Sequence, residues 1–155
     1  MSPEFQEGLL CYLVQSPRGD EYIDVIDEDT FDQVEFKLVH QTLRRYRKLH
    51  GQIPGSLQAS EFVEKEIENT KGIPEKVAKE LRELVQDIYI PLDKRDLQFV
   101  EDKLVENLQD HHIKKQTEAY AKGDIDPREF ITSVSSMSSL SIPGADDIYK
   151  DGGFL

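Results

Sequence analysis

The residue types best suited to chemistry are histidines, and the sequence places them in two regions. Asp110, His111 and His112 stand in a row and are residue types that bind metal ions. Neighbouring residues of a helix point about 100° apart, so adjacent histidines in a helical segment cannot share one ion. His40 and His50 have no acidic residue between them. We interpret all four histidines as packing, surface or interface residues and predict no metal site.

A basic cluster is the second chemical feature, formed by Arg44, Arg45, Arg47 and Lys48 with Tyr46 among them. Such a cluster can contact nucleic-acid phosphates or an acidic partner, with Tyr46 as a stacking face. Cations also complement the dipole at the C-terminal end of a helix, where acidic residues elsewhere in the chain can pair with them. We favour the second interpretation and keep contact with a partner or nucleic acid as the alternative.

The distribution of charge supports that preference. The chain has 155 residues and a net charge of -12, and residues 1–35 carry 10 acids and 1 base. Residues 36–55 carry 5 bases and no acid. An acidic surface repels phosphate backbones, so we expect only weak DNA binding.

Other signals of catalysis and of cofactor binding are missing. The sequence has neither a Walker A pattern nor a G-x-G-x-x-G pattern, and its carboxylates are dispersed. Cys11 is the one cysteine and lies in an apolar stretch, which indicates a buried, inert thiol. With no membrane-length apolar run and no signal-peptide pattern, we predict a cytoplasmic protein with no cofactor and no membrane contact.

Apolar spacing predicts an all-α fold with no convincing strand. A first helix is expected over residues 5–15 and a short one over 20–26, with Asp29 or Thr30 as the N-cap of the next helix and Phe31 packed. That third helix covers 32–50 and ends at Gly51; its expected apolar stripe holds Val34, Phe36, Leu38, Val39, Leu43, Tyr46 and Leu49. Two further helices are expected over 57–68 and 75–89.

The second half of the chain predicts a helical hairpin. Residues 94–122 lack Gly and Pro, and Gly123 ends that segment. Asp126 and Pro127 begin a second leg over 127–139, whose apolar face is expected to hold Phe130, Ile131, Val134 and Met137. We therefore expect a small globular helical bundle followed by a long protruding helical hairpin. The predicted parts are residues 1–5 as a cloning scar, 6–92 as the globular subdomain, 93–140 as the hairpin and 141–155 as the start of a linker.

Apolar residues lie on two sides of the hairpin, which indicates that another chain covers one of them. We expect self-association, at least as a dimer, through Phe99, Val105, Ile113, Tyr120, Phe130 and Val134.

The order of these elements resembles the N-terminal domain of DnaB-type replicative DNA helicases, most nearly the diverged ones of phages. The resemblance runs over residues 6–140: the Leu-Leu-Cys-Tyr-Leu-Val run, the turn ending Asp29-Thr30-Phe31, a basic helix through Tyr46, then Gly51-Gln52-Ile53-Pro54. It implies a non-catalytic collar domain, since the ATP-dependent motor of such helicases is a separate C-terminal domain. It also implies pairing through the hairpins into a trimer of dimers, recruitment of a primase or helicase loader, and location in the host cytoplasm for a phage protein.

Three alternatives stay open from the sequence. One is the related helicase-binding domain of a primase, and another is an unrelated helical module that binds nucleic acid or a regulator through the basic cluster. The third is an enzyme acting through Asp110, His111 and His112.

Overall fold

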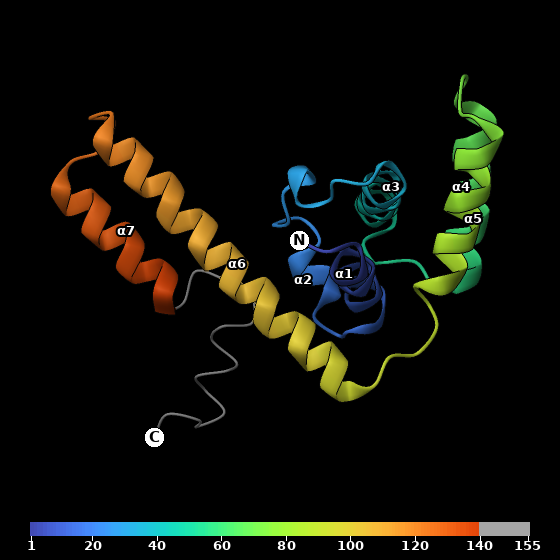
Figure 1. Ribbon diagram of the computed structural model, residues 1–155, viewed down its shortest axis with the longest axis horizontal. Helices are drawn as coiled ribbons and strands as arrows, with labels where there is room; N and C mark the ends of the chain where they lie inside the picture. The colour runs from blue at the N-terminus through green and yellow to red at the C-terminus, as the bar shows by residue number, and fades with distance from the viewer. Residues whose placement is uncertain (140–155) are drawn as a thin grey trace. The chain divides into compact units, whose positions relative to one another are not determined.

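The computed structural model describes residues 1–139, and their regular structure is helical, with no strand in that range (Figure 1). The prediction of an all-α fold is confirmed for these residues. The linker predicted for residues 141–155 lies outside them. The helices are α1 (Pro3–Gln15), α2 (Gly19–Tyr22), η1 (Glu28–Thr30), α3 (Val34–His50), α4 (Ser56–Asn69), α5 (Glu75–Asp87), α6 (Lys94–Ala121) and α7 (Pro127–Ser139).

The chain divides into two units, the first covering residues 1–100 and the second beginning at Glu101. The first turns of α6 thus belong to the first unit, in which Val100 is buried and approaches Gly8 of α1.

Helix α1 supplies the centre of the first unit. Leu9, Leu10 and Leu13 are buried on it, and the α-helical spacing of apolar residues explains why one short helix can bury so many. The side chains buried with them come from the segment that follows: Tyr22, Ile23, Ile26 and Phe31. The predicted packing of Phe31 is confirmed. Residues 1–5 form the cap and first turn of α1, because the Ser2 hydroxyl accepts a hydrogen bond from the Phe5 amide at 3.1 Å; their origin in a cloning vector stays a prediction.

Two glutamines of α1 connect it to distant parts of the first unit. The buried Gln6 side chain donates to Asp32 Oδ1 at 2.8 Å and accepts from the Asp32 amide at 3.1 Å. Gln15 donates to the carbonyls of Ile88 and Ile90 at 2.8 and 2.7 Å and accepts from the Leu92 amide at 2.9 Å. These bonds satisfy backbone groups that irregular segments would otherwise leave unpaired.

The segment after α1 depends on a close backbone approach at Gly19. A Cβ atom at this position would lie 1.9 Å from the carbonyl oxygen of Leu13, so only glycine fits. Helix α2 is shorter than the predicted 20–26 helix, because it ends at Tyr22 and continues as turns to Ile26. The tight return toward α1 places the two acidic residues Asp20 and Asp24 beside α3.

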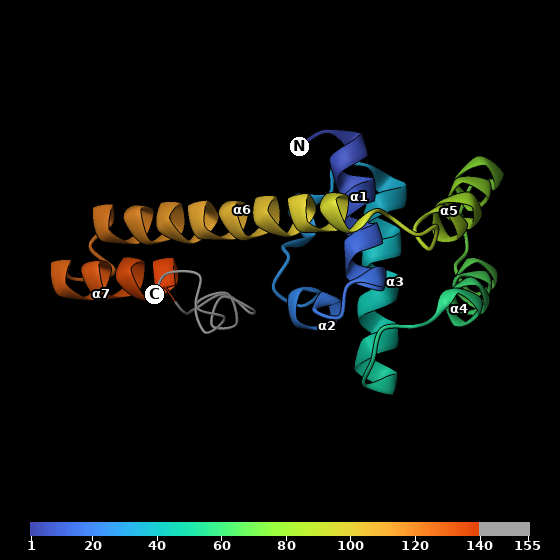
Figure 2. The ribbon, with the colours of Figure 1, turned by 90° about the horizontal axis from the view of Figure 1, so that it is seen from below.

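Helix α3 lies beside α1, and α4 and α5 pair with each other and with α3 (Figures 1 and 2). Its buried stripe holds Phe36, Val39, Leu43 and Tyr46. Val34 and Leu49 were expected in this stripe but are exposed, since they lie at the two ends of the helix, beyond the neighbours that cover its middle.

The structure confirms the predicted C-terminal end of α3 but not its predicted N-cap. The N-cap is Gln33, not Asp29 or Thr30, because the acidic turn is used for the separate 3-10 helix η1, which the Asp27 side chain caps. Gly51 ends the helix in the left-handed conformation (φ 80°), as predicted.

Helices α6 and α7 begin at the caps that the sequence indicates. Asp93 accepts from the Arg95 amide and Asp126 from the Glu129 amide, each at 2.7 Å. Gly123 has a φ of 78° and closes α6, after which α7 runs back alongside it (Figures 1 and 2). At about 1.5 Å per residue, the 28 residues of α6 span roughly 42 Å.

The close approach at Gly19 predicts a contrast between two glycine substitutions. Gly19→Ala should lower the free energy of unfolding by about 3 kcal/mol or more, because the added methyl meets backbone rather than a flexible side chain. Gly8→Ala should leave stability unchanged or raise it by up to about 1 kcal/mol, because its Cβ would lie 3.5 Å from Val100 Cγ2 in a helix interior. Urea denaturation followed by circular dichroism measures both, and equal effects of the two substitutions would contradict this account.

Candidate functional site

The basic cluster lies on the last turns of α3. Arg44, Arg47 and Lys48 are spaced three and four residues apart and so share one side of the helix. Tyr46 faces the interior instead: it is 8% exposed and meets the ring of Phe62 edge-on at 5.4 Å. The stacking face suggested for Tyr46 is therefore wrong, because this ring is part of the core.

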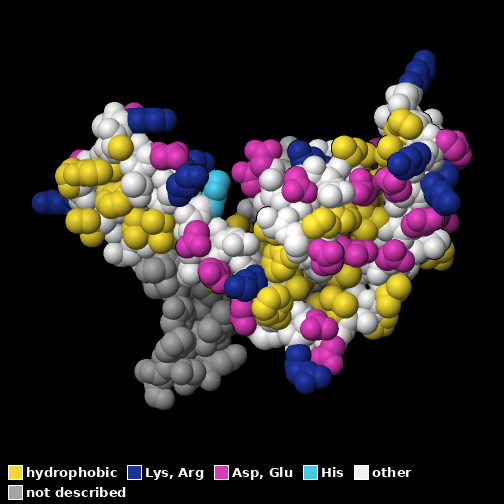
Figure 3. Space-filling model, viewed as in Figure 1, with side chains coloured by type: hydrophobic (Ala, Val, Ile, Leu, Met, Phe, Trp, Pro, Cys, Tyr) yellow, Lys and Arg dark blue, Asp and Glu magenta, His cyan; other side chains and the backbone are white. Residues whose placement is uncertain are grey.

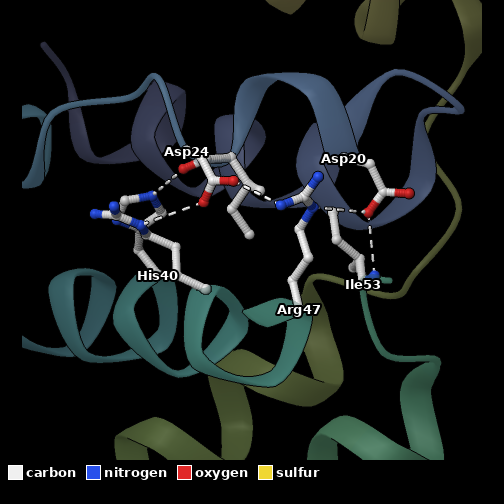
Figure 4. Close-up of polar contacts among 7 residues, drawn as sticks. Asp20, Asp24, His40, Arg47 and Ile53 are labelled. Carbon is white, nitrogen blue, oxygen red and sulfur yellow. Dashed lines mark hydrogen bonds and ion pairs between the residues drawn. The ribbon is translucent and has the colours of Figure 1, made fainter. Parts of the chain in front are cut away.

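Two carboxylates from the α2 region meet this side of α3 (Figure 4). Arg47 Nη1 donates to Asp24 Oδ2 at 2.6 Å, and Arg47 Nε lies 3.5 Å from Asp20 Oδ1, at ion-pair distance but without hydrogen-bond geometry. Arg44 Nε lies 3.8 Å from Asp24 Oδ1. Asp20 also accepts from the Ile53 amide at 3.1 Å, which attaches the segment after α3 to the same group. The pairing of this helix end with the acidic first 35 residues is thereby observed.

Arg45 points to a different partner. Its Nε donates to Glu66 Oε1 of α4 at 3.1 Å, and its Nη2 lies at ion-pair distance from Glu66 Oε2, also 3.1 Å. Lys48 is exposed. The sequence did not identify Glu66 as a partner of Arg45, because their separation of 21 residues gives no local signal. For the pairs that Arg44 and Arg47 form, the available signal was the spacing of Asp20 and Asp24 by one helical turn.

His40 lies on α3 beside this ion-pair group and is fully buried (Figure 4). Its Nε2 lies 3.3 Å from the Ile23 carbonyl, its ring lies 4.9 Å from that of Phe31, and Nδ1 has no hydrogen-bond partner. Burial is the main cause that lowers the pKa of His40, to about 4, and the positive charge of Arg44 lowers it further. The hydrogen bond with the Ile23 carbonyl and the negative charge of Asp24 act in the opposite direction. His40 is thus a neutral core residue at pH 7, which agrees with its interpretation as packing.

In the second unit, α6 and α7 contact each other through polar and aromatic groups. The rings of Tyr120 and Phe130 stack with centroids 5.1 Å apart. His112 Nε2 lies 3.0 Å from the hydroxyl of Ser133. Both contacts join the second half of α6 to α7, and Tyr120 and Phe130, both predicted for self-association, contact each other within the chain.

Exposed apolar side chains remain on both helices. Ile113 is 36%, Tyr120 43% and Ile131 63% exposed, and Figure 3 shows hydrophobic side chains gathered over α7. Val105, Phe130 and Val134 are half-buried, and Phe99, in the first unit, is exposed. Ile131, predicted for the apolar face of this leg, lies next to Phe130 in sequence and so points about 100° away from it, which accounts for its greater exposure.

Two other candidate sites, a metal site and the Cys11 thiol, have less support in the structure. In the part of the chain that the structure describes, no three His, Cys, Asp or Glu side chains gather in an arrangement that could hold a metal ion. Burial raises the pKa of the Cys11 thiol to about 11, so it is protonated and weakly reactive at neutral pH.

None of the helices within residues 1–139 combines the length and the apolarity that crossing a membrane requires.

Comparison with known proteins identifies no relative: no family model, no curated protein and no solved structure matches the chain.

The ion pairs predict that Arg47 stabilises the fold while Lys48 does not. Arg47→Met keeps the aliphatic stem but removes the cation between Asp20 and Asp24, so the free energy of unfolding should fall by about 1 kcal/mol. Lys48→Met removes the same charge from the same helix end and should change stability by less than about 0.5 kcal/mol. Urea denaturation at low and at 1 M salt checks this, and a deficit of Arg47→Met that salt does not reduce would contradict the electrostatic origin.

The burial of His40 predicts a pH dependence of stability. The pKa is about 4 in the folded chain and about 6.5 in the unfolded chain, so the unfolded state binds more protons between these values. The contribution of His40 is favourable above pH 6.5 and is lost as the pH falls toward 4, by about 3 kcal/mol in total. His40→Gln removes the titration and should reduce the slope of unfolding free energy against pH. Identical slopes in the two proteins would contradict a neutral His40.

Proposed function

We propose that this chain is the assembly and partner-docking domain of a DnaB-type replicative helicase, a non-catalytic collar component. The resemblance of residues 6–140 supports the proposal through the order of their elements. The helices of the structure follow that order: a leucine-rich helix, a short acidic turn, a basic helix ending at Gly51, two further helices and a long helix that turns back. We propose with it the finer architecture of a small bundle followed by a protruding hairpin.

One observation carries the assembly role, namely the exposed apolar side chains of α6 and α7. Covering these side chains with a second chain is favourable, by about 25 cal/mol for each Å² of apolar surface removed from water; they are Ile113, Tyr120 and Ile131. Two copies meeting through the same patch form an isologous two-fold contact. A specific interface of standard size needs about 800 Å² from each partner. Three such pairs would form the collar of a hexamer.

The internal contacts of these helices favour a preformed surface. The Tyr120–Phe130 stack and the His112–Ser133 contact hold α6 and α7 together within one chain. Association then costs less conformational entropy than it would for two separate helices, because the pair is already ordered.

The charge arrangement supports docking of proteins rather than of DNA. Arg44, Arg45 and Arg47 each lie within ion-pair distance of a carboxylate, which offsets their attraction for phosphates. With a net charge of -12, the chain is a poor partner for a nucleic-acid backbone. A primase or a loader is the class of partner that the resemblance implies.

Neighbouring residues of α7 provide a matched test of self-association. Ile131→Asp places a charge where we propose that the interface excludes water, and it should weaken dimerisation by about tenfold or more. Thr132→Asp adds the same charge at an exposed polar position one residue away and serves as the control. Sedimentation equilibrium over a concentration series measures the dissociation constants, and circular dichroism checks that both variants fold.

A wild-type chain that stays monomeric at several hundred micromolar would contradict the proposed assembly. Equal dissociation constants for both variants would exclude this face as the interface.

A further inference from the structure

An apolar groove of about 280 Å³ lies between α3, α4 and α5, all in the first unit. Its apolar lining comes from each of these helices and from the turn between α4 and α5: Leu38, Val39, Val63, Ile67, Ile73 and Leu81. Leu38, Ile67 and Ile73 are half-buried. The groove is smaller than most small-molecule pockets, which measure roughly 300–1,000 Å³, and it suits a few side chains of a partner.

A second, basic groove of about 520 Å³ adjoins the first. Four cations line it, Arg44, Arg45, Arg47 and Lys48, together with Asp24 and Gln41. Arg45 and Gln41 line both grooves, so apolar and basic surfaces meet at these two residues. We call the two together the α3–α4–α5 groove.

Arg45 is the residue at which an acidic partner could enter. Its carboxylate partner Glu66 also lines the apolar part, and their side chains are 48% and 32% exposed. Exposed ion pairs contribute about 0–1 kcal/mol, so exchanging Glu66 for a partner's carboxylate costs little. The guanidinium can bind that carboxylate through two parallel hydrogen bonds.

We propose that the α3–α4–α5 groove binds an amphipathic, acidic helical segment of a partner protein. Its aliphatic side chains occupy the apolar part, and its carboxylates contact Arg45 and the neighbouring Arg44 and Lys48. A helix inserted in a groove is the matching mode of recognition, since residues 1–139 offer no sheet edge to which a strand could add. The inference rests on the proposed docking role and specifies where the partner binds and what its chemistry is.

Nucleic acid fits this groove less well. A phosphate backbone has no aliphatic groups for the apolar part, and Tyr46 is buried and cannot stack on a base.

The test uses designed peptides as probes. One is a 16-residue helical peptide of Glu, Ala and Leu with Leu at positions i, i+3, i+4 and i+7; a second has Lys for Glu, and a third has Ala for Leu. Titration into methyl-labelled protein should shift the methyl resonances of Val63, Ile67 and Leu81 with the Glu/Leu peptide. The other two peptides should bind about tenfold more weakly or worse, because each lacks one half of the match.

Two charge-reversal variants separate local recognition from net charge. Arg45→Glu and Lys65→Glu change the net charge equally and lie on exposed helical positions, but only Arg45 lines the groove. Arg45→Glu should weaken binding of the Glu/Leu peptide about tenfold and strengthen binding of the Lys/Leu peptide, while Lys65→Glu changes either by less than about twofold.

Equal affinity for the acidic and basic peptides, or methyl shifts outside the groove, would overturn the proposal. Displacement of the Glu/Leu peptide by a single-stranded oligonucleotide at 150 mM salt would assign the site to nucleic acid instead. The Ile131→Asp variant should bind the peptide normally. A wild-type chain that binds the Glu/Leu peptide but stays monomeric would therefore count against the assembly role alone, and a chain that dimerises but does not bind the peptide would count against the groove alone.

Discussion

The first unit depends on the backbone contact between Gly19 and the Leu13 carbonyl, which no residue with a Cβ could make. This contact returns the chain sharply after α1, so that Tyr22 and Ile23 complete the core around Leu9 and Leu10. The same return brings Asp20 and Asp24 to the basic end of α3. Steric fit at one glycine therefore sets both the packing of the core and the electrostatics of the surface.

That arrangement changes the meaning of the basic cluster. As a sequence motif it is consistent with phosphate binding, but in the fold its arginines lie beside carboxylates, and its tyrosine is buried. Surfaces that gain most from a partner are then the apolar ones: the α6–α7 face with Ile113 and Ile131, and the groove between α3, α4 and α5. A domain whose role is to hold other proteins together needs surfaces of this kind, and we propose that role here.

Local signals predicted the helices well, because apolar periodicity, Asp93 and Asp126 at N-caps and Gly51 and Gly123 at C-termini act within one or two turns. Contacts between distant segments were not predictable, because they produce no pattern within one or two helical turns of the sequence. Examples are the hydrogen bonds of Gln15 with Ile88, Ile90 and Leu92 and the ion pair of Arg45 with Glu66. Exposure at the ends of an amphipathic stripe, as at Val34 and Leu49, depends equally on which neighbours the fold supplies. The self-association residues and the partner remain predictions.

The central claim, that copies of this chain pair through α6 and α7, can be tested most directly by detecting the contact itself. A sample mixed from one isotope-labelled and one unlabelled population yields nuclear Overhauser effects that arise only between chains. The account predicts intermolecular effects from the methyl groups of Ile113 and Ile131 to residues of α6 and α7 in the partner copy. A dimer whose intermolecular effects arise only from residues 1–100, or a chain that shows none at concentrations at which it sediments as a dimer, would contradict the claim.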